Sequence, residues 1–239
     1  MAKVIVGALV GMGPNSTAPF YDLVMNYARK LYGAKNDLDF PEMVMISLPT
    51  PFIPGKELDH ERMISTLTDA IVRLNSLEVN YIVIPCNLVH CYYEMMQKVS
   101  NAPILNIVTI TVETLSKLPL TKKSIALIAT DSVADAGLYQ KEILTKGFEV
   151  FHTRELQNKV NNLLIELKAN QPADKINADW QDIINYLKIN NCMASLIACT
   201  DISPCIKFDT SNLLFVDSID ALAKATIEQY IRLKRLSLR

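Results

Sequence analysis

Two cysteines occupy matching points in this chain, and they are its clearest chemical signal. Cys86 closes the apolar run 79–85, and Cys199 closes the apolar run 193–198. They are 113 residues apart (199 − 86), close to half of the 239 residues. A small polar residue follows each of them. Two thiols at the ends of two buried strands suit a reaction that needs one proton donor or acceptor on each face of a flat intermediate.

A thiol removes a proton only as its thiolate, and a free cysteine has a pKa of about 8.5. Cys86 precedes a helical pattern that begins near Leu88, so we expect backbone N–H groups to point at its sulfur and favour the thiolate. Thr200 and the turn after it are expected to do the same for Cys199. The alternative is that each is a small buried apolar residue, as we expect for Cys91, Cys192 and Cys205.

Polar side chains near the expected strand ends are candidates for holding a substrate carboxylate or amino group. Segment 11–17 is a glycine turn with amide and hydroxyl donors before an amphipathic helix. Thr130 follows the apolar run 125–129. Its position in the second half of the chain corresponds to that of the glycine turn in the first half. Each of these residues could instead be a turn residue or a helix cap. The polar candidates are Asn15, Thr17, Asn87, Thr130, Ser132 and Thr200, and Met12 of the glycine turn is a further candidate.

Composition excludes several classes of protein. The chain has 24 basic and 25 acidic residues, a net charge of −1 and no basic stripe with aromatic residues, so no nucleic-acid partner is expected. The first apolar stretch is short and is interrupted from Gly11, which predicts neither a signal peptide nor a membrane span. Five cysteines without an export signal favour free thiols in a cytoplasmic protein. Cys86 and His90 lack further ligands at metal-binding spacing, so no metal is expected.

Short apolar runs alternate with amphipathic stretches along the whole chain. This alternation, with strands that are apolar throughout, predicts an α/β fold with parallel sheets covered on both faces. The expected strands are 4–10, 43–48, 81–85, 104–108, 125–129, 150–151, 194–198 and 213–216. The expected helices are 20–31, 59–76, 91–99, 109–118, 137–145, 156–169, 179–189 and 218–236.

Equivalent features recur at nearly constant offsets, which indicates duplication of one four-stranded unit. Val4 to Ile125 is 121 residues, Cys86 to Cys199 is 113, and Ile104 to Leu213 is 109. The alternative is the approximate periodicity of any doubly wound chain. We predict two pseudo-symmetric lobes, each with a mostly parallel four-stranded sheet, and an active site in the cleft between them. The first lobe comprises 1–108 and 219–239, and the second comprises 109–218.

Three segments resemble the aspartate/glutamate racemase family, and more narrowly its aspartate racemase branch. They are Gly-Met-Gly-Pro-Asn-Ser-Thr (11–17), Pro-Cys-Asn-Leu-Val-His (85–90) and Ala-Cys-Thr-Asp-Ile (198–202). The resemblance runs nearly end to end. It implies two pseudo-symmetric α/β domains, catalysis by Cys86 and Cys199 without a cofactor, and an amino-acid substrate. It also implies a homodimer, by analogy with the family.

In that branch an arginine after an Ile-Pro pair and a lysine on a later helix contact the substrate's side-chain carboxylate. The corresponding positions here are Lys56 and Lys168, so the lysine matches and the arginine is replaced. A lysine ammonium is a point charge and cannot form the paired contact of a guanidinium. Other departures from the branch bear on substrate identity, and they lie at Val10, Leu88, Val133 and Asp201.

The function we predict is cofactor-independent racemisation of aspartate or glutamate by two cysteine bases. Within enzymes, the alternatives are a related hydantoin racemase or a maleate-isomerase-like enzyme. Outside enzymes, the alternative is a small-molecule-binding protein on the same scaffold, although a binder has no need for a second proton donor. His90 lies four residues after Cys86, and we expect it to be structural or to have a minor role in tuning the thiol.

Overall fold

The computed structural model describes residues 3–52, 58–121, 123–206 and 213–237. The chain divides into two compact units, which we call unit 1 (Met1–Ile107 and Leu222–Arg239) and unit 2 (Val108–Ala221). Within the described ranges, no helix combines the length and the apolar character needed to cross a membrane. Each unit is built around its own parallel sheet.

Unit 1 contains a three-stranded sheet with β1 (Ile5–Val10) in the centre, β2 (Glu42–Ser47) on one side and β3 (Tyr81–Val83) on the other. The prediction of a fourth strand at 104–108 is wrong. Ile104 forms a single parallel bridge to Ile82, and helix α4 (Ile107–Ser116) begins three residues later. The bridge uses the Pro103 carbonyl and the Leu105 N–H. The next N–H in this register, that of Ile107, donates to the His90 ring instead, so the ladder ends as the chain enters the helix.

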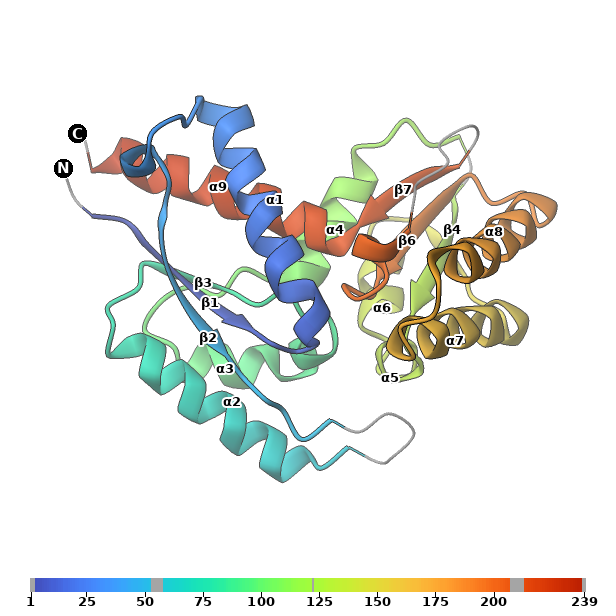
Figure 1. The fold of residues 1–239 in the computed structure, drawn as a ribbon, viewed down its shortest axis with the longest axis horizontal. Helices are drawn as coiled ribbons and strands as arrows, with labels where there is room; N and C mark the ends of the chain where they lie inside the picture. The colour runs from blue at the N-terminus through green and yellow to red at the C-terminus, as the bar shows by residue number, and fades with distance from the viewer. Residues whose placement is uncertain (1–2, 53–57, 122, 207–212, 238–239) are drawn as a thin grey trace. The chain divides into compact units, whose positions relative to one another are not determined.

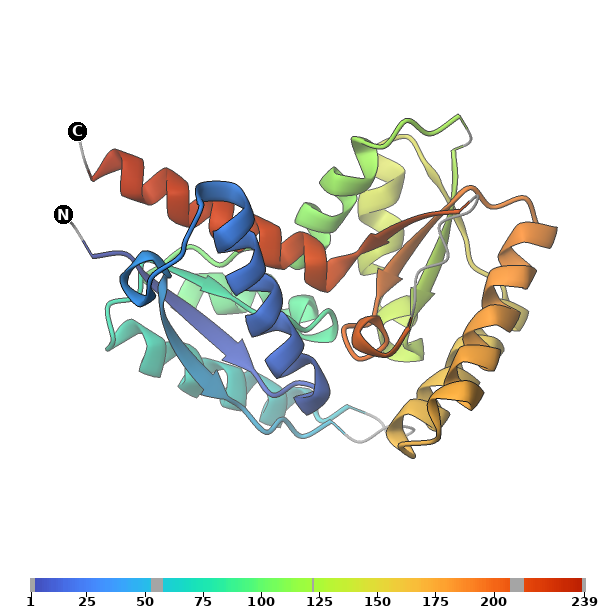
Figure 2. The same ribbon diagram turned by 45° about the horizontal axis from the view of Figure 1, so that its top comes forward.

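Helices cover both faces of this sheet. Figures 1 and 2 show α2 (His60–Asn75) and α3 (Tyr93–Val99) over one face, and α1 (Thr17–Tyr32) with α9 (Ser218–Leu236) over the other. The fully buried phenol of Tyr81 donates to the backbone carbonyl of Thr226 at 2.7 Å, which fixes α9 against β3. Strands covered on both faces explain why the apolar runs do not alternate with polar residues.

Unit 2 contains a four-stranded parallel sheet in the order β5 (Glu149–Phe151), β4 (Ser124–Ala129), β6 (Ala194–Ala198) and β7 (Leu214–Asp217). Helices α7 (Arg154–Lys168) and α8 (Ala173–Ile189) cover one face, and α4 with α6 (Leu138–Thr145) covers the other (Figures 1 and 2). Among the described residues the two sheets share one topology. The first strand is central, the second lies on one side, and the third lies on the other with the fourth segment beyond it.

Helix ends follow capping chemistry, which explains most boundaries. The side chain of Asp59 accepts from the N–H of Arg62 at the start of α2, and Thr153 accepts from Leu156 at the start of α7. Gly33 ends α1 in the left-handed conformation, with φ at 76°. Two expectations need correction: the helix predicted at 91–99 is split into the 3-10 helix η3 (Leu88–Tyr92) and α3, and the helix predicted at 179–189 begins at Ala173.

Candidate active site

Cys86 lies just past the carboxyl end of β3, beside the loop that follows β1. Ala8 pairs with Val83, and three residues beyond this pair on each strand come Gly11 and Cys86. The two therefore lie at the same edge of the sheet, where parallel α/β folds place their ligands. The Cys86 side chain is half-buried, and its backbone N–H donates to the carbonyl of Ile84 at 2.8 Å.

The glycine loop is fixed by close backbone contacts. Gly11 has a φ of 88°, and a Cβ placed there would lie 2.7 Å from the Ser47 Oγ, so a larger residue would strain the loop and meet β2. The Gly11 N–H donates to the Thr17 Oγ1 at 3.1 Å, and the Ser16 hydroxyl donates to the carbonyl of Gly13 at 2.9 Å. Thr17 thus holds the turn through its hydroxyl oxygen. Of the other loop candidates, Met12 is buried and Asn15 is exposed.

The imidazole of His90 is bonded to the backbone around Cys86. Its Nδ1 lies 2.8 Å from the Cys86 carbonyl oxygen, and the N–H of Ile107 donates to its Nε2 at 3.3 Å. The side chain is 3% exposed, and its burial lowers its pKa from 6.5 to about 4. Asn87, between them in sequence, is also buried and is the N-cap residue of η3, where its carbonyl accepts from the His90 N–H.

Cys199 occupies the equivalent place in unit 2. Ala129 pairs with Ala198, so the next residues, Thr130 and Cys199, lie side by side at the carboxyl edge of the sheet. Cys199 and Thr200 are both buried, at 7% and 5% exposed. The N–H of Ile202 donates to the Cys199 carbonyl at 3.2 Å, which closes the turn after the thiol.

Thr130 has a capping role. Its Oγ1 accepts from the N–H of Val133 at 3.3 Å at the start of a short helix, α5 (Asp131–Asp135), which was not predicted. Val133 is buried in unit 2, which explains the absence of a hydroxyl there. Ser132 is half-buried in the first turn of α5. The capping alternative for Thr130 is therefore the one seen, and any contact with substrate remains a prediction.

A chain of polar side chains lies beside β4 and was not predicted from the sequence. The buried Gln157 amide donates to the carbonyl of Ala129 at 3.0 Å and to the Asn161 Oδ1 at 2.9 Å. Its Oε1 lies 2.7 Å from His152 Nε2, and the Asn161 amide reaches Asp131 Oδ2 at 2.9 Å. The available signal was a glutamine on the face of α7 that otherwise buries Val160 and Leu164, at i+3 and i+7.

Lys168 is the last residue of α7 and is exposed, while Lys56 lies outside the described residues. Lys168 is close enough to Asp201 to lower the pKa of that carboxyl, against a larger opposite effect of burial that raises it. The Asp201 Oδ1 is buried and has no hydrogen-bond partner among the described residues. Two residues after Cys199, unit 2 thus has a carboxylate oxygen available for a donor.

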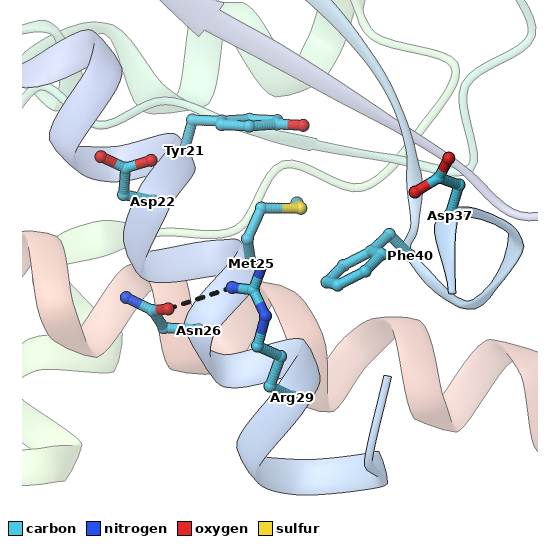
Figure 3. Close-up of a pocket in the computed structure, with 7 residues that line it drawn as sticks. All are labelled: Tyr21, Asp22, Met25, Asn26, Arg29, Asp37 and Phe40. Carbon is cyan, nitrogen blue, oxygen red and sulfur yellow. Dashed lines mark hydrogen bonds between the residues drawn. The ribbon is translucent and has the colours of Figure 1, made fainter. Parts of the chain in front are cut away.

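Unit 1 also has a hollow of about 580 Å³. Figure 3 shows its lining from α1 and the segment around η2 (Asp37–Asp39), with the Met25 sulfur directed into it. The Arg29 guanidinium lies 5.0 Å from the centre of the Phe40 ring and donates to Asn26 Oδ1 at 3.1 Å. Among the residues that the structure describes, neither a thiol nor a predicted substrate-binding residue lines this hollow.

The remaining predictions at the site have mixed outcomes. Cys192 is buried as expected, but Cys91 is exposed, which corrects the expectation that it is a buried apolar residue. His60, for which no role was predicted, lies with its Nδ1 2.7 Å from the Tyr92 hydroxyl. In the part of the chain that the structure describes, no three His, Cys, Asp or Glu side chains group so as to hold a metal ion.

Comparison with known proteins agrees with this architecture. A family model described as Asp/Glu/Hydantoin racemase matches residues 9–226. The chain is 36% identical over 228 residues to the broad specificity amino-acid racemase RacX of Bacillus subtilis (strain 168), covering 95% of this chain and 98% of that protein.

Solved structures share the fold. The aspartate racemase of Picrophilus torridus aligns with a TM-score of 0.78 at 24% identity, over 95% of this chain and 94% of its own. A glutamate racemase from Francisella tularensis, solved with D-glutamate, aligns with a TM-score of 0.61 at 15% identity, over 97% and 82%. The predicted α/β fold with parallel sheets and the predicted racemase activity are both confirmed. The chain belongs to the Asp/Glu/Hydantoin racemase family.

Proposed function

We propose that this racemase interconverts the enantiomers of an amino acid with Cys86 and Cys199 as its two bases. The observation that carries the proposal is their equivalence. Each thiol follows the third strand of a parallel sheet, and the two sheets share one topology. Each lies beside the loop that follows its unit's central strand. In each unit, one thiol and one loop therefore lie at the carboxyl edge of that unit's own sheet.

The two thiols divide one proton exchange between them. The thiolate of one cysteine takes the α-proton, so that an S–H bond forms and the C–H electron pair is delocalised into the substrate carboxylate. The thiol of the other cysteine gives its proton to the opposite face of the planar α-carbon and becomes the thiolate. The enzyme ends with its proton on the other sulfur, and the reverse reaction exchanges the roles. The reaction proposed here uses no cofactor.

An acidic substrate, aspartate or glutamate, is the first candidate. A second carboxylate on the substrate needs a cation. The candidates are Lys168 in unit 2 and Lys56 in unit 1. Backbone N–H groups and the side chains of Asn87 and Thr200 next to the thiols would hold the α-carboxylate and α-amino group. Met12, Asn15, Thr17, Thr130 and Ser132 are the remaining proposed contacts.

A wider substrate range is the second candidate, and one feature of unit 2 favours it. The Asp201 carboxylate lies near Lys168 and offsets part of the positive charge that an acidic substrate would need. The similar Bacillus subtilis protein is named for broad specificity. The acidic residue would accept a hydrogen bond from a substrate that carries a donor.

Exchange of the α-proton in deuterium oxide tests the proposal and separates its two forms. The protein is incubated with L-aspartate, L-glutamate and a panel of neutral and basic amino acids, and deuterium at the α-carbon is followed by mass spectrometry. Exchange confined to aspartate or glutamate supports the acidic form, and exchange with several classes supports the wider range. Absence of α-exchange with every amino acid at millimolar concentration would refute the proposal.

A further inference from the structure

The two nitrogens of the His90 ring are both engaged with backbone groups. Because the Ile107 N–H donates to Nε2, that nitrogen is the unprotonated one. The proton is then on Nδ1, which donates it to the Cys86 carbonyl at 2.8 Å. Tyr93 stacks on the ring with an interplanar angle of 11° and a centroid distance of 6.2 Å, and its hydroxyl donates to the Ile104 carbonyl. The Leu105 backbone is a further neighbour of the ring. The tautomer with its proton on Nδ1 is the one that satisfies the Cys86 carbonyl and the Ile107 N–H together.

The ring is therefore in the wrong state to exchange protons with the thiol. Burial lowers the pKa of His90 to about 4, so the imidazole is neutral at physiological pH. Its one proton is used by a carbonyl and its one lone pair by an amide. A role as general base for Cys86 would require one of these bonds to break inside a buried site, which costs free energy.

Unit 2 achieves the same bond without a side chain. There the Cys199 carbonyl accepts from the backbone N–H of Ile202, three residues on. In unit 1 the residue three after the cysteine is Val89, and the Cys86 carbonyl accepts instead from the imidazole four residues on. Both thiols thus have the carbonyl of their own residue held by a donor from the turn that follows.

We propose that His90 is a positioning residue that fixes the Cys86 turn by joining its carbonyl to the first N–H of α4. This inference rests on the proposed two-thiol function. The carbonyl and the thiol belong to the same residue, so rotation of the peptide plane changes both the direction of Cβ and the electrostatic potential at the sulfur. The bond to Nδ1 prevents that rotation. The bond at Nε2 gives the N–H of Ile107 an acceptor at the start of α4, where the helix itself provides none.

Three substitutions separate this role from general structural support. His90→Leu removes both bonds and keeps an apolar group of comparable size. His90→Asn keeps a donor close to the position of Nδ1 and loses the acceptor for Ile107. Gln97→Leu is the matched control, because Gln97 also makes two backbone bonds in unit 1, to Ala102 and Ile104, and neither involves the thiol turn.

The first measurement needs no substrate. Alkylation by iodoacetamide is followed against pH, with the Cys86 and Cys199 peptides quantified separately by mass spectrometry. His90→Leu should shift the midpoint for Cys86 by about one pH unit or change its limiting rate about tenfold, while Cys199 keeps its profile. His90→Asn should restore most of the Cys86 profile, and Gln97→Leu should leave it unchanged. The buried Cys192 reports unfolding, since it reacts only when unit 2 opens.

The second measurement uses elimination from the separate enantiomers of 3-chloroalanine. One thiolate removes the α-proton, chloride leaves the β-carbon, and the 2-aminoacrylate formed is hydrolysed to pyruvate and ammonium. Each enantiomer presents its α-proton to one thiol, so Cys86→Ser and Cys199→Ser should slow opposite enantiomers. His90→Leu should slow only the enantiomer that Cys86→Ser slows, by about a hundredfold in kcat with little change in KM, as expected for a misplaced reacting group.

The outcomes distinguish this inference from the function on which it rests. If the serine variants are selective for opposite enantiomers but His90→Leu slows both equally, or leaves both unchanged, the positioning role is refuted and the two-thiol function stands. Alkylation of Cys86 with the wild-type profile in His90→Leu would refute it as well. If neither serine variant is selective for an enantiomer, the two-thiol function itself fails, whatever the alkylation shows.

Discussion

At the scale of single residues, the proposed activity depends on the surroundings of each thiol and on the cation that binds the substrate side chain. Cys86 is half-buried beside a glycine loop, while Cys199 is buried beside the cap of a short helix. The two sites are equivalent in topology and different in detail. We expect that difference to appear as unequal thiol pKa values, because burial disfavours a thiolate and adjacent N–H groups favour it.

Lys168→Ala tests the acidic form of the proposed substrate. Truncating one partner of a charged hydrogen bond costs about 2–5 kcal/mol where the pair is buried, as it would be once the substrate covers Lys168, and each 1.4 kcal/mol is a factor of about ten. If the substrate side chain is anionic, kcat/KM for aspartate and glutamate should fall by about a hundredfold or more. Lys141→Ala, another exposed lysine of unit 2, is the control. Unchanged kinetics in Lys168→Ala would mean that the substrate side chain carries no negative charge.

Lys56 gives a complementary test on the same substrates. Lys56→Ala should have a smaller effect than Lys168→Ala, because an ammonium cannot form the paired contact of a guanidinium. Lys56→Arg should raise aspartate turnover by restoring that contact. A fall in aspartate turnover in Lys56→Arg would contradict the assignment of Lys56 to the substrate side chain.

At the scale of elements, the ends of strands and helices decide the geometry, and Thr130 is the clearest case. Thr130→Ala removes the cap of α5, which typically costs about 1 kcal/mol of stability. Thr153→Ala removes the equivalent cap of α7, where no substrate contact is proposed. Both variants should lose similar stability in urea titrations, and only Thr130→Ala should also raise KM. Equal KM values in the two variants would remove Thr130 from the substrate site.

The end of β7 carries a carboxyl whose ionisation opposes folding. Burial raises the pKa of Asp217 from 3.8 to about 7, although Ser203 and the N–H of Ile219 donate to it at 2.7 and 3.1 Å. Between these two pH values the native state binds more protons than the unfolded state, so this group lowers stability as pH rises through the window.

Asp217→Asn keeps the accepting oxygen and removes the ionisation. One pKa unit corresponds to about 1.4 kcal/mol, and partial solvent exposure reduces the full effect. The variant should therefore be more stable than the wild type by about 2 kcal/mol at pH 8 and nearly equal to it at pH 4. Chemical denaturation at both pH values measures this. An equal difference at the two pH values would show that the ionisation of Asp217 is not the cause.

Much of the fold was predictable from sequence because both sheets bury their strands on both faces. The strand predicted at 194–198 and the helix predicted at 218–236 match β6 and α9. The strand is an apolar run that ends at Cys199, and the helix begins at a serine. The strand predicted at Ile104–Val108 was wrong because a buried apolar run has the same pattern in a strand and in the first turn of a helix. The start of α8 was missed because its first turn, after Pro172, is polar.

Of the site, the sequence could predict only the residues that lie within recognisable motifs. The bond from Ile107 to His90 joins residues 17 apart and has no local signal.

At the scale of the whole molecule, a homodimer is expected by analogy with the family. Sedimentation velocity at micromolar protein should give a single species of twice the chain mass of 26.8 kDa. The same measurement on Cys86→Ser should give the same result, because the thiol has no part in the expected assembly. A stable monomer that retains full activity would contradict the expectation.

The most direct test of the central claim compares racemisation with elimination in the single variants Cys86→Ser and Cys199→Ser. In the proposed mechanism racemisation needs both thiols, whereas elimination from a given enantiomer needs one. The account predicts that each variant loses racemisation nearly completely, keeps its circular dichroism spectrum, and still eliminates chloride from one enantiomer of 3-chloroalanine. Substantial racemisation by either variant, with unchanged structure, would contradict the assignment of Cys86 and Cys199 as the two bases.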